Sequence, residues 1–191
     1  MIEKTIKGIK YRLDEENLTA EVIQKKGYEG DIIIPETVVF KKVAYRVTSI
    51  GGYAFSGCSS LTSIVIPDGV TSIGDSAFES CSSLTTVVVA EGNTVYDSRE
   101  QCNAIIHTAT NTLIRGCQNT IIPDGVTGIG EKAFYNCKSL TSIVIPDGVT
   151  SIGSSAFDYC SSLTSIVIPE SVTSIEYSTF FNCSSLTSIV I

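Results

Sequence analysis

Several features that catalysis or metal binding would need are scarce in this sequence. It has a single histidine, His107, and no C-x-x-C pair among its seven cysteines. A zinc knuckle needs such cysteine spacing, and Ser–His or Cys–His catalysis would have to use His107. Polar residues crowd this histidine on an expected hairpin, and no acid stands beside it to orient the ring. We therefore expect a solvated turn histidine, no catalytic residue, no metal site and no cofactor.

Long apolar runs and cations are also scarce. No stretch approaches the roughly 18 continuous apolar residues that suggest a spanning helix, so we expect no membrane insertion. The first residues show no apolar run of signal-peptide length, which leaves open a cytosolic protein or one whose export signal lies outside this chain. The net charge is −7, and only four of the 13 Lys and Arg residues follow residue 46. This balance argues against nucleic acid as a partner.

What the sequence does contain is a repeat with a period of 23 residues. Leucine, phenylalanine and cysteine each return at this interval, in two runs separated by a longer gap. The repeated positions are Leu61, Leu84, Leu140, Leu163 and Leu186; Phe55, Phe78, Phe134, Phe157 and Phe180; and Cys58, Cys81, Cys137, Cys160 and Cys183. The unit is L-T-S-I-V-I-P-D-G-V-T-S-I-G-x-x-A-F-x-x-C-x-S, which is typical of a stacked repeat protein.

Each part of the unit predicts a local structure. Alternation of Ile64 and Ile66 with small residues predicts a short strand, which the following Pro-Asp-Gly ends as a turn. The A-F-x-x-C segment places its apolar residues at helical spacing and predicts a short helical turn. A single unit buries too little apolar surface to fold alone, so units must stack. The sequence therefore predicts an α/β repeat, a solenoid with about seven parallel strands in a sheet on one face and short helical turns on the other.

The repeat also sets the expected domain organisation. Residues 1–30 alternate apolar and polar side chains and predict an N-terminal β-hairpin cap, and residues 31–191 form the repeat array. Two coils are enlarged, near residues 36–46 and 90–118. The first insertion predicts a hairpin around Val38 to Tyr45. The second predicts a hairpin of Ala104–His107 with Thr112–Ile114.

The cysteines fall into two groups. Five occupy the same repeat position, which predicts a buried column of reduced thiols, each filling a small apolar slot. A disulfide ladder is the alternative, but an odd column cannot pair completely. Cys102 and Cys117 lie outside the column and flank the second insertion. They are free thiols or, in an exported protein, a disulfide that closes the insertion.

The motif L-x-x-I-x-I-P-x-x-V-x-x-I-G-x-x-A-F-x-x-C resembles the BspA-like leucine-rich-repeat family over roughly residues 30–191. The second insertion, with its N-T-V-Y-D-S, N-A-I-I and T-L-I segments, is similar to a variant within that family. The resemblance implies a leucine-rich-repeat solenoid. It also implies a bacterial protein at the cell surface or secreted, because family members are typically exported and some are adhesins for host matrix proteins or other bacteria.

Two surfaces offer candidate binding residues. The exposed positions of the repeated strands are nearly uniform Ser and Val, which makes that face a weak recognition site. Positions around the A-F-x-x-C turns vary, and tyrosine is a frequent anchor at interfaces. The candidates are Tyr135, Tyr159, Tyr177 and Phe181 on the turns, and Tyr96, Asp97, Arg99 and Glu100 on the second insertion. The alternative is that the turn positions are unconstrained and the insertion is purely structural.

These observations favour a non-enzymatic binding or adhesion module that recognises a protein or glycan through an extended solenoid surface. A structural module that associates with itself is the alternative, and an enzyme is a remote third hypothesis. Self-association would take the form of a homodimer through the C-terminal coil. Its last strand, Ser188–Ile191, carries neither charge nor proline on its free edge, and such edges pair readily. The alternative is a native chain that continues past Ile191, in which the next coil would pair with this edge instead.

Overall fold

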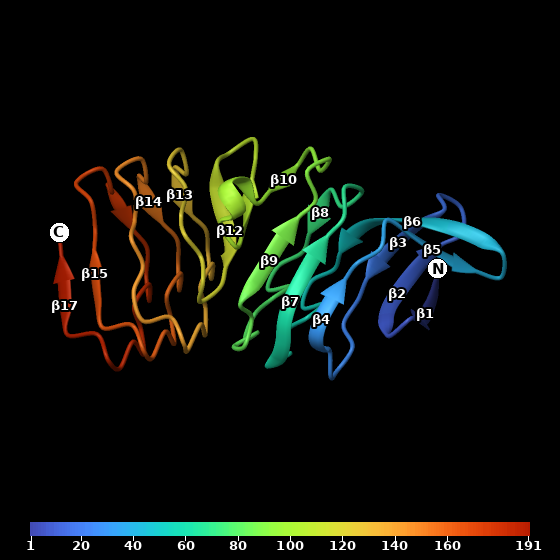
Figure 1. The fold of residues 1–191 in the computed structure, drawn as a ribbon, viewed down its shortest axis with the longest axis horizontal. Helices are drawn as coiled ribbons and strands as arrows, with labels where there is room; N and C mark the ends of the chain where they lie inside the picture. The colour runs from blue at the N-terminus through green and yellow to red at the C-terminus, as the bar shows by residue number, and fades with distance from the viewer.

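The computed structural model describes residues 1–191 as an elongated stack, with successive coils following one another along the long axis from the N-terminus to the C-terminus (Figure 1). The N-terminal third is rich in longer strands. These are β1 (Ile2–Ile6), β2 (Ile9–Asp14), β3 (Thr19–Val22), β4 (Glu29–Ile33), β5 (Thr37–Phe40), β6 (Val43–Ile50) and β7 (Ser60–Ile66).

The rest of the chain contains shorter elements. They are β8 (Ser72–Ile73), β9 (Thr86–Val89), β10 (Tyr96–Asp97), the 3-10 helix η1 (Arg99–Gln101), β11 (Ala104–His107), β12 (Thr112–Gly116), β13 (Gly128–Ile129), β14 (Ser151–Ile152), β15 (Ser165–Val167), β16 (Ser174–Ile175) and β17 (Ser188–Val190).

The N-terminal segment is a three-stranded antiparallel unit rather than a single hairpin. β1 pairs with β2 and β2 with β3, and their inward positions, such as Tyr11 and Leu13, are fully buried. β3 then pairs in parallel with β6, which joins this unit to the array. β5 and β6 form an antiparallel hairpin that pairs Val38 with Tyr45, within the first enlarged coil.

Two sets of parallel strands hold neighbouring coils together. The L-x-x-I-x-I segments pair as β4–β7–β9 and as β15–β17, with partners 23 residues apart such as Ser63 with Thr86. The T-S-I-G segments form a second set, in which β8 pairs with β6, and β14 pairs with β13 and β16. Parallel pairing one repeat apart is the register that a solenoid requires.

The parallel strands predicted for one face are present but do not all belong to one sheet. The β4–β7–β9 sheet and the β15–β17 sheet are separate, and the second insertion lies between them (Figure 1). The buried side chains accordingly form two clusters, one of 28 residues and one of 22, which meet at the insertion. Within the insertion, β10 pairs with β11 and β11 with β12 in the antiparallel sense, and β12 then pairs in parallel with β13, so that the insertion joins the ladder of the second half.

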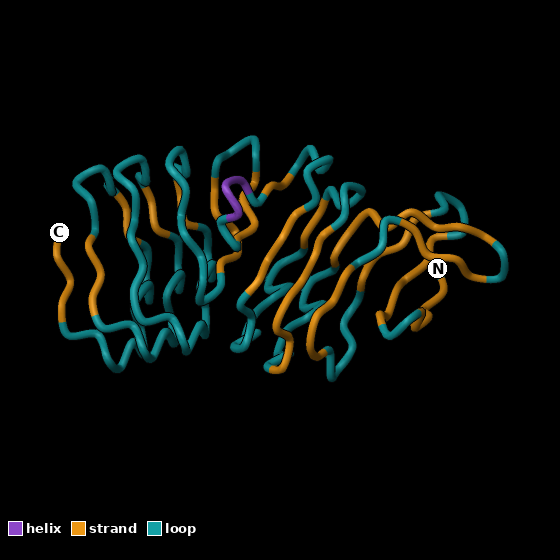
Figure 2. The backbone as a smooth tube through the Cα atoms, in the orientation of Figure 1, coloured by secondary structure: helices purple, strands orange, loops and turns teal.

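The predicted helical turns are wrong. The three-residue η1 is the one helix of the chain, and the A-F-x-x-C segments are non-helical turns (Figure 2). Each of these turns contains two residues in the left-handed region, for example Ser76 at φ 54° and Ser80 at φ 60°. A right-handed helix cannot continue through such residues. The chain instead forms successive tight turns, with hydrogen bonds from Ala77 N to Gly74 O and from Cys81 N to Phe78 O.

In this conformation, every second backbone N–H group of the turn donates to the next coil along the solenoid axis. The N–H groups of Phe55, Phe134 and Phe157 donate to carbonyl oxygens of the next coil at 2.8, 2.7 and 2.9 Å. A helix would use these donors within its own turn. The turns therefore form a backbone ladder of their own, here named the turn ladder, which joins neighbouring regular coils.

Beneath the turn ladder lies the column of phenylalanine rings. Phe55 stacks on Phe78 with ring centroids 5.3 Å apart, and Phe157 stacks between Phe134 and Phe180 at 5.0 and 5.5 Å. The column is interrupted between Phe78 and Phe134, which belong to different core clusters. Both the ring column and the sheet are thus broken at the second insertion.

All seven cysteines are free and buried. The Sγ atoms of Cys81, Cys160 and Cys183 donate to the carbonyl oxygen of the phenylalanine of the preceding coil at 3.1 to 3.2 Å. Cys117 donates to Thr85 O at 3.2 Å and to Asn103 O at 3.4 Å. Column and insertion thiols alike therefore serve as small core side chains with a weak hydrogen bond.

We predict that the column thiols react slowly with a bulky thiol reagent while the protein is folded. Burial raises the pKa of Cys81 to about 12 and also raises the pKa of Cys137 and Cys160, so little thiolate forms at neutral pH. Labelling followed by peptide mass spectrometry measures the rate at each site, and the urea-unfolded protein is the control in which all seven cysteines should react. Rapid labelling of Cys81 or Cys160 in the folded protein would contradict the buried column.

Candidate binding surface

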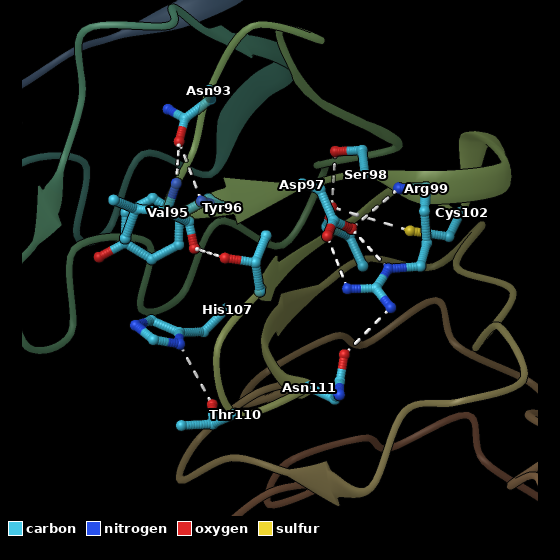
Figure 3. Close-up of polar contacts among 12 residues, drawn as sticks. Asn93, Val95, Tyr96, Asp97, Ser98, Arg99, Cys102, His107, Thr110 and Asn111 are labelled. Carbon is cyan, nitrogen blue, oxygen red and sulfur yellow. Dashed lines mark hydrogen bonds and ion pairs between the residues drawn. The ribbon is translucent and has the colours of Figure 1, made fainter.

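The second insertion is anchored by one buried asparagine. The side-chain nitrogen of Asn93 donates to Val70 O at 2.8 Å and Pro67 O at 3.0 Å in the previous coil. Its Oδ1 accepts from the backbone N–H groups of Val95 and Tyr96, each at 2.9 Å (Figure 3). The amide thus joins the insertion to the preceding coil and fixes the start of β10.

Tyr96 is largely buried and lines the cavity that is described below. Only 6% of its surface is exposed. Its hydroxyl accepts the N–H of Ile73 at 3.2 Å, where a neighbouring strand would otherwise pair with β8. Its ring meets the ring of His107 edge-on at 5.7 Å, and His107 Nδ1 lies 3.2 Å from Thr110 Oγ1 (Figure 3). Tyr96 therefore closes the gap after β8 and is part of the core.

Asp97 and Arg99 form an ion pair with each other. Arg99 Nη2 lies 2.6 Å from Asp97 Oδ2, and Arg99 also donates to Asn111 Oδ1 at 3.1 Å (Figure 3). Partial burial acts to raise the pKa of Asp97, but the hydrogen bonds and charge of Arg99 outweigh it and lower that pKa. Glu100 is exposed at φ 57°. Of the four insertion candidates, Glu100 is exposed, Asp97 and Arg99 are partly exposed and paired with each other, and Tyr96 is buried.

The turn candidates come together on the C-terminal coils. Tyr135 meets Tyr159 edge-on at a centroid distance of 5.7 Å, and Tyr159 meets Phe181 in the same way at 6.5 Å. Tyr159 is 42% exposed and Phe181 58%. We name these three residues the aromatic strip. Tyr177 is exposed on the last coil but takes no part in these ring contacts.

The aromatic strip exists because neighbouring coils place their turns side by side, although its three residues do not all occupy the same turn position. Tyr135 and Phe181 follow the column phenylalanine directly, while Tyr159 comes one residue later and reaches between them. Asp158 occupies the intervening position and is buried, which raises its pKa. Lys132 Nζ lies 5.8 Å from the centre of the Tyr135 ring and adds a cation–π contact at the N-terminal end of the strip. The strip is thus preorganised by packing between coils.

A cavity of about 550 Å³ opens where the turn ladder is interrupted. One wall is the turn from Gly74 to Glu79, and the other is formed by β11, β12 and the start of the next regular turn at Glu131. Lys132 also lines the cavity, and its Nζ lies 3.3 Å from Ser76 Oγ and 3.5 Å from Glu79 Oε2 on the opposite wall. A volume of this size is typical of small-ligand sites.

Arg115 on β12 was missed as a candidate from the sequence. It lines the cavity and is only 4% exposed, and its Nε has no hydrogen-bond partner. The signal was present in the T-L-I-R-G segment. Alternation within a strand places Arg115 on the same face as Leu113, which is fully buried. A cation on the buried face of a short strand is the unusual feature that could have drawn attention to it.

Parallel strands one repeat apart, stacked coil on coil, define a leucine-rich-repeat solenoid. A family model described as a BspA-type leucine-rich-repeat region matches the chain in six copies, over residues 35–107 and 113–191. The chain belongs to this BspA-type leucine-rich-repeat family, as its repeat motif predicted.

Solved structures of bacterial repeat proteins are similar. The chain is 33% identical to a leucine-rich-repeat protein of Bacteroides ovatus, with a TM-score of 0.53, over 98% of this chain and 41% of that one. A T. pallidum leucine-rich-repeat protein is 26% identical with a TM-score of 0.48 (98% and 71% covered), and a leucine-rich cell surface protein of Faecalibacterium prausnitzii is 19% identical with 0.47 (100% and 94% covered). This chain thus spans less than half the length of the B. ovatus protein. No curated protein matches the sequence.

Two further features of the structure concern membrane and metal binding. None of its helices has the length and apolarity needed to cross a membrane. No group of three or more His, Cys, Asp or Glu side chains is placed so that it could hold a metal ion.

Proposed function

We propose that the protein is a non-enzymatic binding or adhesion module, located at the cell surface or secreted, that recognises a protein or glycan through the aromatic strip. The observation that carries this proposal is the contact of three partly exposed aromatic rings across three successive coils. Family membership supports a binding module in general, and the strip supplies a surface for it.

The geometry of the aromatic strip suits recognition. Its rings hold one another at fixed angles, so little side-chain freedom is lost when a partner binds. The rings combine apolar faces with the two tyrosine hydroxyls, which lets them pack against apolar groups and still make hydrogen bonds. The nearby Lys132 and Glu79 provide charge at one end. By contrast, the exposed side chains of the strands, such as Val167, repeat with little variation and carry no charge.

A binding assay with matched variants tests this function. Surface plasmon resonance against a panel of immobilised host matrix proteins and glycans would identify a partner. We expect Tyr159→Ser to weaken binding by roughly tenfold or more, because loss of an interface aromatic typically costs over 1 kcal/mol. Val167→Ser removes a similarly exposed apolar side chain from the strand face and should leave the affinity unchanged. The proposal fails if Val167→Ser abolishes binding while Tyr159→Ser does not.

A further inference from the structure

Two backbone N–H groups in the wall of the cavity at the second insertion have no hydrogen-bond acceptor. In the regular coils, the residue before alanine and the column phenylalanine donate their N–H groups to the next coil, as Lys132 does to Ser154 O and Phe134 to Ala156 O. The equivalent residues of the second coil are Ser76 and Phe78, and their N–H groups have no acceptor. Both residues line the cavity. The wall therefore carries two unpaired donors that ordinary stacking would have satisfied.

Arg115 adds a buried positive charge to the same cavity. Its guanidinium makes only two long contacts, from Nη1 to Tyr135 O at 3.4 Å and from Nη2 to Cys137 Sγ at 3.8 Å. Nε has none, and no carboxylate forms an ion pair with this side chain. A buried cation without a counter-ion strongly destabilises a folded protein. An anionic group in the cavity would supply both the missing charge and the missing acceptor.

The rim of the cavity has the opposite character. Asp75 and Glu131 are exposed carboxylates at its edge, and Tyr53 is an exposed ring beside them. Glu79 is already paired with Lys132. Carboxylates at a rim repel a peptide that carries several acidic side chains, but they accept hydrogen bonds from neutral hydroxyl groups. An interior that combines the Arg115 cation with apolar side chains such as Ile105 and Ile114, inside an acidic and aromatic rim, fits a ligand that combines one anionic group with several hydroxyls.

We propose that this cavity binds one acidic sugar unit of a glycan, with the sugar carboxylate at Arg115 and the N–H groups of Ser76 and Phe78. The sugar hydroxyls then donate to Asp75 and Glu131. The inference rests on the proposed binding function and deepens it by naming the ligand chemistry. The cavity lies next to the aromatic strip, because Lys132 lines the cavity and also lies over the Tyr135 ring. The two sites are distinct, since no residue of the strip lines the cavity.

Titration of the whole chain with sodium glucuronate tests the proposal by NMR and calorimetry. Glucose, glutamate and sodium sulfate are the comparison ligands. We expect glucuronate to bind more tightly than all three and to shift the amide signals of Ser76 and Phe78 most. Equal binding of glutamate would assign the site to peptide carboxylates, and equal binding of sulfate would assign it to an adventitious ion only; either result overturns the sugar assignment.

Variants of Arg115 separate binding from folding. Arg115→Met should weaken glucuronate binding at least about tenfold, since hydrogen bonds to charged groups are among the stronger ones. Without ligand, this variant should have a higher melting temperature, because a buried, unpaired charge is replaced by an apolar side chain of similar length. Arg115→Lys keeps the charge without the fork of donors and should bind with intermediate affinity. Arg46→Met, an exposed arginine outside the cavity, is the control and should change neither property.

Two outcomes would overturn the inference while leaving the proposed function in place. One is a lower melting temperature of Arg115→Met together with unchanged affinity for glucuronate, which would make Arg115 a structural residue. The other is the absence of any glucuronate binding while the Tyr159→Ser variant still loses its macromolecular partner. The reverse result is that glucuronate binds but Tyr159→Ser leaves the binding of the macromolecular partner unchanged. That result would refute the proposed role of the aromatic strip and leave the sugar site in place.

Discussion

Truncation of Phe157 to alanine is expected to lower the free energy of unfolding by about 3–5 kcal/mol, the usual cost of removing a buried phenylalanine ring. Phe157 is fully buried and lies between Phe134 and Phe180 in the ring column. Both faces of the ring are therefore in contact, and its removal leaves a cavity that two neighbouring coils line. Backbone hydrogen bonds of the turn ladder restrain these coils and limit their collapse into the space.

Urea unfolding followed by circular dichroism measures this loss. Phe181→Ala provides the control, because Phe181 belongs to the same turn family but is 58% exposed. We expect the control to change the free energy of unfolding by less than about 1 kcal/mol. A similarly small change for Phe157→Ala would show that the A-F turn does not belong to the core.

Substitution of Gly116 by alanine is the second large effect that we expect, a loss of about 1–3 kcal/mol from overpacking. Gly116 replaces the column phenylalanine in the irregular coil, and its N–H donates to Ala133 O at 2.9 Å as a phenylalanine would. A Cβ atom at this position would lie 2.2 Å from Cε1 of Phe134. That ring cannot move aside, because it is fully buried and stacked on Phe157.

Thermal and urea unfolding of Gly116→Ala measure this effect. Gly148→Ala is a suitable control, since the nearest atom to its added Cβ would be Val126 O at an ordinary 3.5 Å. A double variant, Gly116→Ala with Phe134→Leu, should recover part of the lost stability, because the shorter side chain vacates the space. Unaltered stability of the single variant would mean that the ring does not occupy the place of the missing phenylalanine.

The repeat and its parallel pairing could be predicted from the sequence because both follow from spacing. The helical turns could not, since Ala77, Phe78 and Cys81 fit helical spacing and a chain of tight turns equally well. The deciding residues are the left-handed Ser76 and Ser80, and serine carries no signal for that conformation. A hint was present across the repeats, because Gly57, Asn136 and Asn182 occupy the position of Ser80. Glycine and asparagine are the residues that favour positive φ.

The candidate binding residues also differ in how far their positions could be predicted from the sequence. The stacking of the turns in register indicates that Tyr135 and Phe181 lie on the same face of neighbouring turns, but the place of Tyr159 between them, one turn position later, does not follow from the register. Tyr96 could not be judged locally, because its role depends on the N–H of Ile73 in the preceding coil. The cavity was equally hidden. It arises from an interruption of the turn ladder, and the period of the sequence describes only the coils that do not interrupt it.

The break between the two halves has a consequence for how such a protein can evolve. Each regular coil touches only its immediate neighbours, so coils can be duplicated or deleted in either half without disturbing more distant residues. The cavity lies at the junction, and its walls come from the last regular turn before the insertion, from β11 and β12 of the insertion and from the first regular turn after it. Changes in the number of coils would therefore alter the reach of the molecule while its ligand chemistry stayed constant. Length and specificity are two characters that selection can adjust separately.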